Sequence, residues 1–199
     1  MKQKEIIVEA FTDMVRALEI LEAETVIIKG MIHCGRYRFS LYPGQRIVGF
    51  DNQSGLSFRY DKAQSAFLLP ERSCLENLKI EVTAEKYPGK EAMQAVVEAN
   101  GYQSVLKNIF MDIRVKELKK ESLMQYAGIY PRHEVLLSGN LHIYCRGHDI
   151  APIADCPLAT SRFVGNGVNL RLDGGKLEAL RQLELRGENN VINIKTAAR

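Results

Sequence analysis

Short segments in which apolar and polar residues alternate recur along most of this chain, and no other feature limits its fold as strongly. Alternation of this kind indicates a strand with one buried face, because successive side chains of a strand point to opposite sides. The apolar members of these segments are Tyr37, Phe39 and Leu41; Leu56, Phe58 and Tyr60; Leu78, Ile80 and Val82; Ile109, Met111, Ile113 and Val115; Leu141, Ile143 and Cys145; Leu170 and Leu172.

The spacing of these segments predicts a repeated architecture. We take the strand centres as Phe39, Phe58, Ile80, Met111, Ile143 and Leu172, which are separated by 19, 22, 31, 32 and 29 residues. Periods in this range are typical of a solenoid, in which each repeat adds one coil. An ordinary antiparallel sandwich is the alternative. The expected fold class is therefore mostly β, a right-handed parallel β-helix.

Asparagine recurs at a similar place in three of these segments. The sequences are LENLKI at Leu75–Ile80, LKNIFM at Leu106–Met111 and, less closely, LSGNLHI at Leu137–Ile143. Asparagine tolerates left-handed backbone angles, and its amide can bond to a neighbouring turn. We expect these residues to form tight bends between strands. In a sandwich they would lie in unrelated turns.

The N-terminal segment has the periodicity of a helix instead. Between residues 5 and 22 the apolar side chains follow one another at steps of 4, 3, 4 and 3, which puts Ile7, Phe11, Met14, Leu18 and Leu21 on one face. We expect residues 1–24 to form a capping helix and residues 25–199 to form the β-helix. The charged segment from Val115 to Tyr126 predicts a helical or loop insertion near 115–127.

Composition and charge exclude several classes of protein. The 199 residues are 46% hydrophobic and 26% charged, as in globular domains. Lys and Arg number 27 against 24 for Asp and Glu, a net charge of +3 that does not favour nucleic acid or a membrane surface as partner. Glu5, Glu9 and Asp13 interrupt the N-terminal apolar residues. We therefore expect a soluble protein that is cytoplasmic, or exported without a conventional signal peptide.

The four cysteines predict buried, reduced thiols. Cys34, Cys74, Cys145 and Cys156 form no CxxC pair and are too sparse for a disulfide framework. His142, Cys145 and His148, followed by Asp155 and Cys156, are the densest group of possible zinc ligands. However, the odd offset between His142 and Cys145 puts them on opposite faces of a strand. We expect no metal site and no cofactor here.

Three segments together resemble a known architecture. They are the amphipathic helix from Ile7 to Leu21, Arg46-Ile47-Val48-Gly49, and Leu75-Glu76-Asn77-Leu78-Lys79-Ile80. This order is similar to that of the right-handed parallel β-helix of the pectin lyase-like group. The resemblance implies that the helix caps the open end of the solenoid. It also implies an outward sheet face of the kind that many members use to bind or cleave acidic polysaccharides.

If the alternating strands stack in one sheet, their polar residues form a ladder with rungs about 4.8 Å apart. Such a stripe of charged and aromatic side chains suits an anionic or hydroxylated chain, although polar outward residues are also ordinary surface. We predict a noncatalytic binding module for a protein or polysaccharide, with self-association along the solenoid axis as a further possibility. The predicted binding residues are Lys79, Glu81, Asp112, Arg114, His142, Tyr144, Arg171 and Asp173.

The alternative function is a polysaccharide lyase or glycoside hydrolase. Asp112, Arg114 and His142 are then the candidate catalytic residues, and a lyase would require calcium, for which Glu76, Glu81 and Asp112 are the nearest carboxylates. Gly147-His148-Asp149 matches only part of the Gly-His-Gly motif of some glycosidases. The chain lacks tryptophan, a common stacking platform in sugar-processing clefts, and this favours binding over catalysis.

Overall fold

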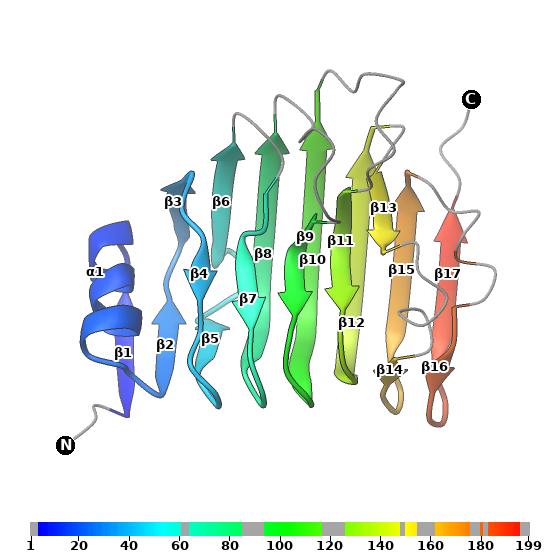
Figure 1. Cartoon of the computed structure of the whole chain (residues 1–199), viewed down its shortest axis with the longest axis horizontal. Coiled ribbons are helices and arrows are strands. Elements are labelled where there is room, and N and C mark those ends of the chain that lie inside the picture. Colours follow the sequence, from blue (N-terminus) through cyan, green and yellow to red (C-terminus); the bar gives the residue numbers. More distant parts are fainter. Residues whose placement is uncertain are drawn as a thin grey trace.

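A computed structural model describes residues 4–60, 64–84, 94–116, 126–147, 150–154, 162–175, 180 and 183–195. Its parallel strands stack side by side into a β-solenoid, with β1 at one end and β17 at the other (Figure 1). Every strand pair in the described residues is parallel, which rejects the antiparallel sandwich. The predicted mostly-β solenoid is confirmed.

In the described part of the chain, sheet A contains twelve strands and consists of two halves joined by three long strands. The long strands are β8 (Cys74–Ala84), β10 (Ser104–Val115) and β12 (Val135–Arg146). In the first half, β5 (Arg46–Gly49) pairs with β8 and β14 (Phe163–Val164) pairs with β12, and the ladder continues outward through β2 (Thr25–Ile28) to β1 (Glu5–Val8) at one end and to β16 (Leu185–Arg186) at the other. In the second half, β6 (Gly55–Tyr60) pairs with β8 and β15 (Asn169–Gly174) pairs with β12, and the ladder continues to β3 (Met31–Gly35) at one end and to β17 (Val191–Lys195) at the other.

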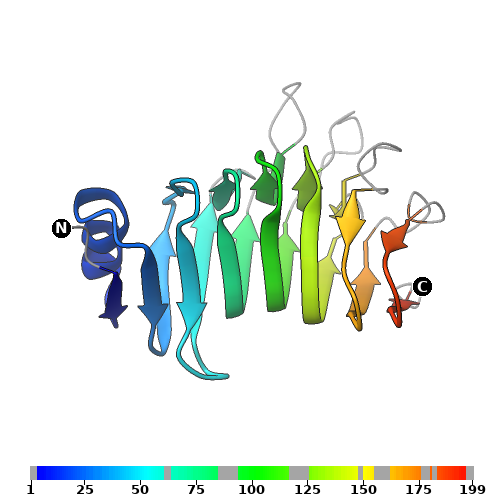
Figure 2. The same cartoon turned by 90° about the horizontal axis from the view of Figure 1, so that it is seen from below.

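Sheet B closes the other side of the solenoid (Figure 2). Its five strands are β4 (Phe39–Ser40), β7 (Phe67–Leu69), β9 (Gln94–Ala99), β11 (Tyr126–Pro131) and β13 (Ile150–Ile153). Phe39 therefore lies in sheet B. The prediction that Phe39 is the first strand centre of the same series as Ile80 and Met111 is wrong. Alternation reveals which face of a strand is buried, but it does not reveal which sheet the strand joins.

Asn77 and Asn108 form bends at the corner between the halves of sheet A, as predicted, whereas in the third predicted segment the bend is at Gly139 and not at Asn140. Asn77 and Asn108 have φ angles of 54° and 51°, and Gly139 takes the same left-handed turn at 68°. The Asn108 Nδ2 donates to Asn77 Oδ1 over 2.9 Å, while Asn108 Oδ1 accepts from the Asn140 backbone N–H at 3.0 Å. Asn169 and Asn193 continue the ladder with donor–acceptor distances of 3.3 and 3.5 Å. At the bend, the asparagine side chains of one coil are thus hydrogen-bonded to the next coil.

The core contains rows to which each coil contributes one apolar side chain. One such row, on the inward side of the second half of sheet A, is Ile32, Leu56, Ile80, Met111, Ile143, Leu172 and Ile194, at intervals of 24, 24, 31, 32, 29 and 22 residues. The first six are at most 2% exposed. Phe58 aligns with Val82, so Leu56 is the true rung partner of Ile80. Burying each such side chain stabilises the fold by about 1.5–3 kcal/mol.

The N-terminal cap is shorter than predicted. Glu5–Val8 forms β1, paired with β2, and the helical part consists of α1 (Phe11–Val15) and the π-helical η1 (Arg16–Ile20). The prediction of a helix over residues 5–22 is wrong at its start. Residues 5–8 form a strand instead, because their backbone groups hydrogen-bond to β2 and so extend the parallel sheet. Helical periodicity could not exclude this, since Ile6 and Val8 also alternate as in a strand.

The helical segment still covers the solenoid end. Met14, Ala17 and Leu18 are at most 3% exposed, and they pack onto the same core as the inward strand residues. The buried Gln45 anchors this cap, because its Nε2 donates to the backbone carbonyls of Leu18 and Ala23 over 3.1 and 2.9 Å. An uncapped first coil would expose its apolar interior to water.

The predicted insertion near 115–127 falls mostly on residues 117–125, which lie outside the described residues. Strand β10 ends at Val115 and β11 begins at Tyr126. In the part of the chain that the structure describes, no helix has the length and apolarity needed to cross a membrane.

Candidate functional site

The outward side chains of the second half of sheet A form one continuous surface, which we call the polar face. The strand register places them in three rows that cross the strands. The first row is Met31, Gly55, Lys79, Phe110, His142, Arg171 and Asn193. The second row is His33, Ser57, Glu81, Asp112, Tyr144, Asp173 and Lys195. The third row is Arg59, Thr83, Arg114 and Arg146.

All eight residues predicted as an outward ladder lie on this face. The register brings Lys79 beside Phe110 and Glu81 beside Asp112, so Arg114 falls in the third row next to Arg146. The strand alternation identified the outward residues correctly. Phe110 and Arg146 also lie on this face but were not among the predicted binding residues, although both follow the same alternation as the predicted residues of their strands.

Asp112 is the most enclosed charged group of the polar face. Its carboxylate accepts hydrogen bonds from Arg114 Nη2 at 2.7 Å and Arg146 Nη2 at 3.2 Å, and Arg146 Nε lies 3.1 Å from the other oxygen. The Asp112 side chain is 8% exposed, whereas those of Arg114 and Arg146 are 50% and 46% exposed. The hydrogen bond to Asp112 raises the pKa of Arg114. The acid is thus enclosed, and the two guanidinium groups face solvent.

Asp173 is held in the same manner on the neighbouring side of Tyr144. Its Oδ2 lies 2.9 Å from His142 Nε2 and 2.8 Å from Arg171 Nε, so imidazole and guanidinium share one oxygen. The other oxygen is buried and has no hydrogen-bond partner among the residues that the structure describes. The His142–Asp173 contact joins adjacent strands, so it depends on a register that one strand's sequence does not reveal.

Aromatic rings separate these charged groups. Phe110 meets the His142 ring edge to face, with centroids 5.0 Å apart. The Arg146 guanidinium lies 4.7 Å from the centroid of Tyr144, within the range of a cation–π contact. Rings and planar cations alternate along the face, so a bound chain would meet both apolar and ionic groups.

The alternative catalytic set is only partly brought together. Asp112 and Arg114 contact each other, but His142 bonds to Asp173 instead. Glu76, one of the possible calcium ligands, lies in the first half of sheet A, where Arg46 Nη2 and Lys107 Nζ approach it to 2.7 and 2.6 Å. Among the described residues, no group of three His, Cys, Asp or Glu side chains is arranged to hold a metal ion.

The cysteines of the described segments agree with the prediction. Cys34, Cys74 and Cys145 are free and buried, and burial raises the pKa of the Cys34 thiol to about 12. Cys145 is on the inward face, whereas His142 is on the outward face, so they cannot share a zinc ion. His148, Asp155 and Cys156 lie outside the described residues.

Comparison with known proteins gives no further identification. No protein-family model, no curated protein and no solved structure matches this chain.

Proposed function

We propose that this chain is a noncatalytic binding module that holds an acidic polysaccharide on the polar face. The observation that carries the proposal is the difference in exposure between the two aspartates of this face and the arginines that hold them. The side chains of Asp112 and Asp173 are 8% and 11% exposed, while those of the arginines are about half exposed. At these two places a negatively charged ligand would contact guanidinium groups before it met a carboxylate.

The charge balance of the polar face supports the same ligand class. Its three rows contain the cations Arg59, Lys79, Arg114, Arg146, Arg171 and Lys195 and the carboxylates Glu81, Asp112 and Asp173. Six cations against three acids make this face more basic than the chain as a whole, which has a net charge of +3 spread over 199 residues. A local basic field attracts anionic ligands and accelerates their association.

The geometry suits a polymer better than a small molecule. Parallel strands repeat about every 4.8 Å along the solenoid axis, so each row offers a regular series of contacts to an extended chain. Phe110 and Tyr144 supply ring surface for the apolar faces of sugars. The resemblance to the pectin lyase-like group, many of whose members bind or cleave acidic polysaccharides, also favours this ligand.

The proposal is tested by titrating polygalacturonate oligomers into the protein by calorimetry at low and high salt. The test variant is Lys79→Gln with Lys195→Gln, because Lys79 pairs with the exposed Glu81 and Lys195 is exposed. The control is Lys29→Gln with Arg186→Gln, which removes two equally exposed cations outside the polar face.

We expect the test variant to bind about three- to tenfold more weakly, since each exposed ionic contact contributes about 0.2–1 kcal/mol. The control should bind as the unmodified protein does, and raised salt should weaken binding because it screens exposed charges. Absence of binding, or equal losses in both variants, would reject the polar face as the site.

The His142–Asp173 pair favours polysaccharide cleavage as a second candidate function. With Nε2–H donating to Asp173, the Nδ1 atom of His142 is left as a base able to take the proton next to a uronate carboxylate. The described carboxylates do not fit a calcium site, because Glu76, Glu81 and Asp112 are each held by cations. Release of unsaturated ends that disappears in His142→Ala, while binding persists, would establish a lyase. Intact polysaccharide would reject it.

We also propose self-association along the solenoid axis, through β17 of a second copy. The inward-facing Ile192 and Ile194 are 36% and 43% exposed, whereas their neighbours Leu170 and Leu172 are fully buried. In an antiparallel pairing of two β17 strands about Asn193, Ile192 of one copy faces Ile194 of the other. Sedimentation should show a dimer that Ile192→Lys dissociates, and a monomer at all concentrations would reject this pairing.

A further inference from the structure

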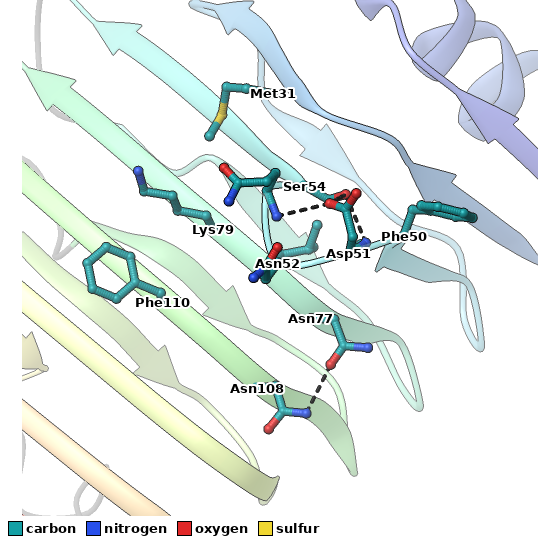
Figure 3. A pocket seen from close by; sticks show the side chains of 12 residues that line it. Met31, Phe50, Asp51, Asn52, Ser54, Asn77, Lys79, Asn108 and Phe110 are labelled. Carbon is teal, nitrogen blue, oxygen red and sulfur yellow. Dashed lines mark hydrogen bonds between the residues drawn. The ribbon is translucent and has the colours of Figure 1, made fainter.

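A groove lies where the polar face meets the asparagine corner, and we call it the corner groove (Figure 3). It has a volume of about 710 Å³, within the usual range for small-ligand sites. One wall is the loop between β5 and β6, with Asn52 and Gln53 near its tip. The floor and the other wall come from Asn77, Lys79 and Phe110. The groove therefore opens onto the first row of the polar face.

The loop of this groove is fixed by its own hydrogen bonds. Asp51 Oδ1 accepts from the Gln53 backbone N–H and from Ser54 Oγ, each at 2.9 Å, and the Asp51 backbone N–H donates to Ser54 Oγ at 3.1 Å. Gly49 starts the loop where a Cβ would lie only 1.9 Å from the Asn77 carbonyl oxygen, so no larger residue fits. This wall of the groove is thus preformed, because its conformation is held by hydrogen bonds within the loop.

Amide groups with unused hydrogen-bonding capacity line the groove. The side chains of Asn52 and Gln53 make no hydrogen bond to any described residue, and only the oxygen of the Asn77 amide is engaged, by Asn108. Each free amide offers both donors and acceptors, which is the pattern that matches sugar hydroxyls. The ring of Phe50 points away from these amides (Figure 3), so Phe110 provides the aromatic surface of the groove.

We propose that the corner groove binds an uncharged sugar unit, through the amides of Asn52, Gln53 and Asn77 and the ring of Phe110. The inference extends the proposed function, since Lys79 and Phe110 belong to both surfaces. An uncharged unit is favoured because, of the described residues that line the groove, Lys79 is the only cation, and Glu81 pairs with it at 2.6 Å. The groove would add selectivity for a particular sugar to the general attraction of the polar face for acids.

The test uses isotope-labelled protein and two kinds of probe. Methyl glycosides of glucose, galactose and mannose are titrated separately, followed by nuclear magnetic resonance signals of the side-chain amides, and polygalacturonate is titrated in parallel. The test variant is Asn52→Ala with Gln53→Ala, which leaves the Asp51–Ser54 bonds in place. Asn100→Ala is the matched control, because Asn100 is also exposed and its side chain makes no described hydrogen bond.

We expect at least one glycoside to shift the amide signals of Asn52 and Gln53 with little dependence on salt. The test variant should weaken this response about tenfold or more, since it removes two hydrogen-bonding groups, and Asn100→Ala should not change it. Shifts confined to other regions, no response to any of the three glycosides, or an unchanged response in the test variant would overturn the proposal. Polygalacturonate binding reports on the polar face separately, so either proposal can fail alone.

Discussion

Replacing Asn108 tests whether the asparagine corner stabilises the solenoid in the way its geometry indicates. Asn108 does two things: its side chain bonds to the coils on either side, and its backbone takes a left-handed φ of 51°. Asn108→Ala loses both hydrogen bonds, at about 0.5–1.5 kcal/mol each, and replaces a residue that tolerates the left-handed angle by one for which that angle costs about 1–2 kcal/mol. The expected loss in free energy of unfolding is about 2–5 kcal/mol.

Asn108→Gly separates the two contributions. Glycine adopts the left-handed angle freely, so this variant loses the hydrogen bonds and keeps the backbone conformation. We expect it to be more stable than Asn108→Ala by about 1 kcal/mol, even though glycine is the smaller and more flexible residue. Asn193→Ala is the control, because Asn193 lies at the exposed end of the ladder with a 3.5 Å contact and should cost little.

Urea unfolding followed by circular dichroism measures all three variants, with the free energy taken from the midpoint and slope. The slopes should stay similar, since the corner residue changes little of the surface exposed on unfolding. Equal stability of Asn108→Ala and the unmodified protein would refute the ladder as a stabilising feature. Equal stability of the alanine and glycine variants would refute the argument from backbone angle.

Three other substitutions have defined outcomes. Gly139→Ala should destabilise the fold, because its Cβ would lie 2.0 Å from Asn108 Oδ1 at a φ of 68°, and the unfolding midpoint measures this. Met14→Ala should cost about 2–5 kcal/mol, since this cap residue is fully buried; a loss below about 1 kcal/mol would show that the cap packs loosely. Burial opposes ionisation of Glu76, yet the hydrogen bonds from Lys107 and Arg46 lower its pKa below the ordinary 4.5. Its stabilising effect is present above that value and lost as pH falls through the folded-state pKa, so Glu76→Gln should lose less stability on acidification than the unmodified protein.

The buried faces of the strands could be predicted from this sequence because a solenoid repeats one local rule. Leu78, Ile80 and Val82 alternate with polar residues, and all three are buried as that pattern requires. The bends could be predicted for a similar reason, since asparagine is one of few residues that enter the left-handed region readily. Both the buried face of a strand and the position of its bend are local properties, so the sequence of a single strand and its turn is enough to predict them.

The register between coils could not be predicted in the same way. At the corner, β12 has one residue more than β10. Lys107 pairs with Ser138 before the corner and Ile109 pairs with Leu141 after it, so the register between the two strands shifts by one residue. The contact between His142 and Asp173 follows from such pairings across coils, as does the place of Arg114 beside Arg146. The start of the cap was also ambiguous, because Glu5–Val8 satisfies both a helical and a strand pattern and only pairing with β2 decides between them.

Oxidative footprinting of the complex with polygalacturonate tests the central claim most directly, because it locates the ligand on the surface. Phe110, His142 and Tyr144 are reactive side chains of the polar face, and Tyr102, which is 63% exposed and stacks on His133, provides the internal control. We predict that bound polygalacturonate protects the three polar-face residues and leaves Tyr102 and His133 unchanged. Protection of Tyr102 and His133 with no change at Tyr144 would contradict the assignment of the polar face as the binding surface.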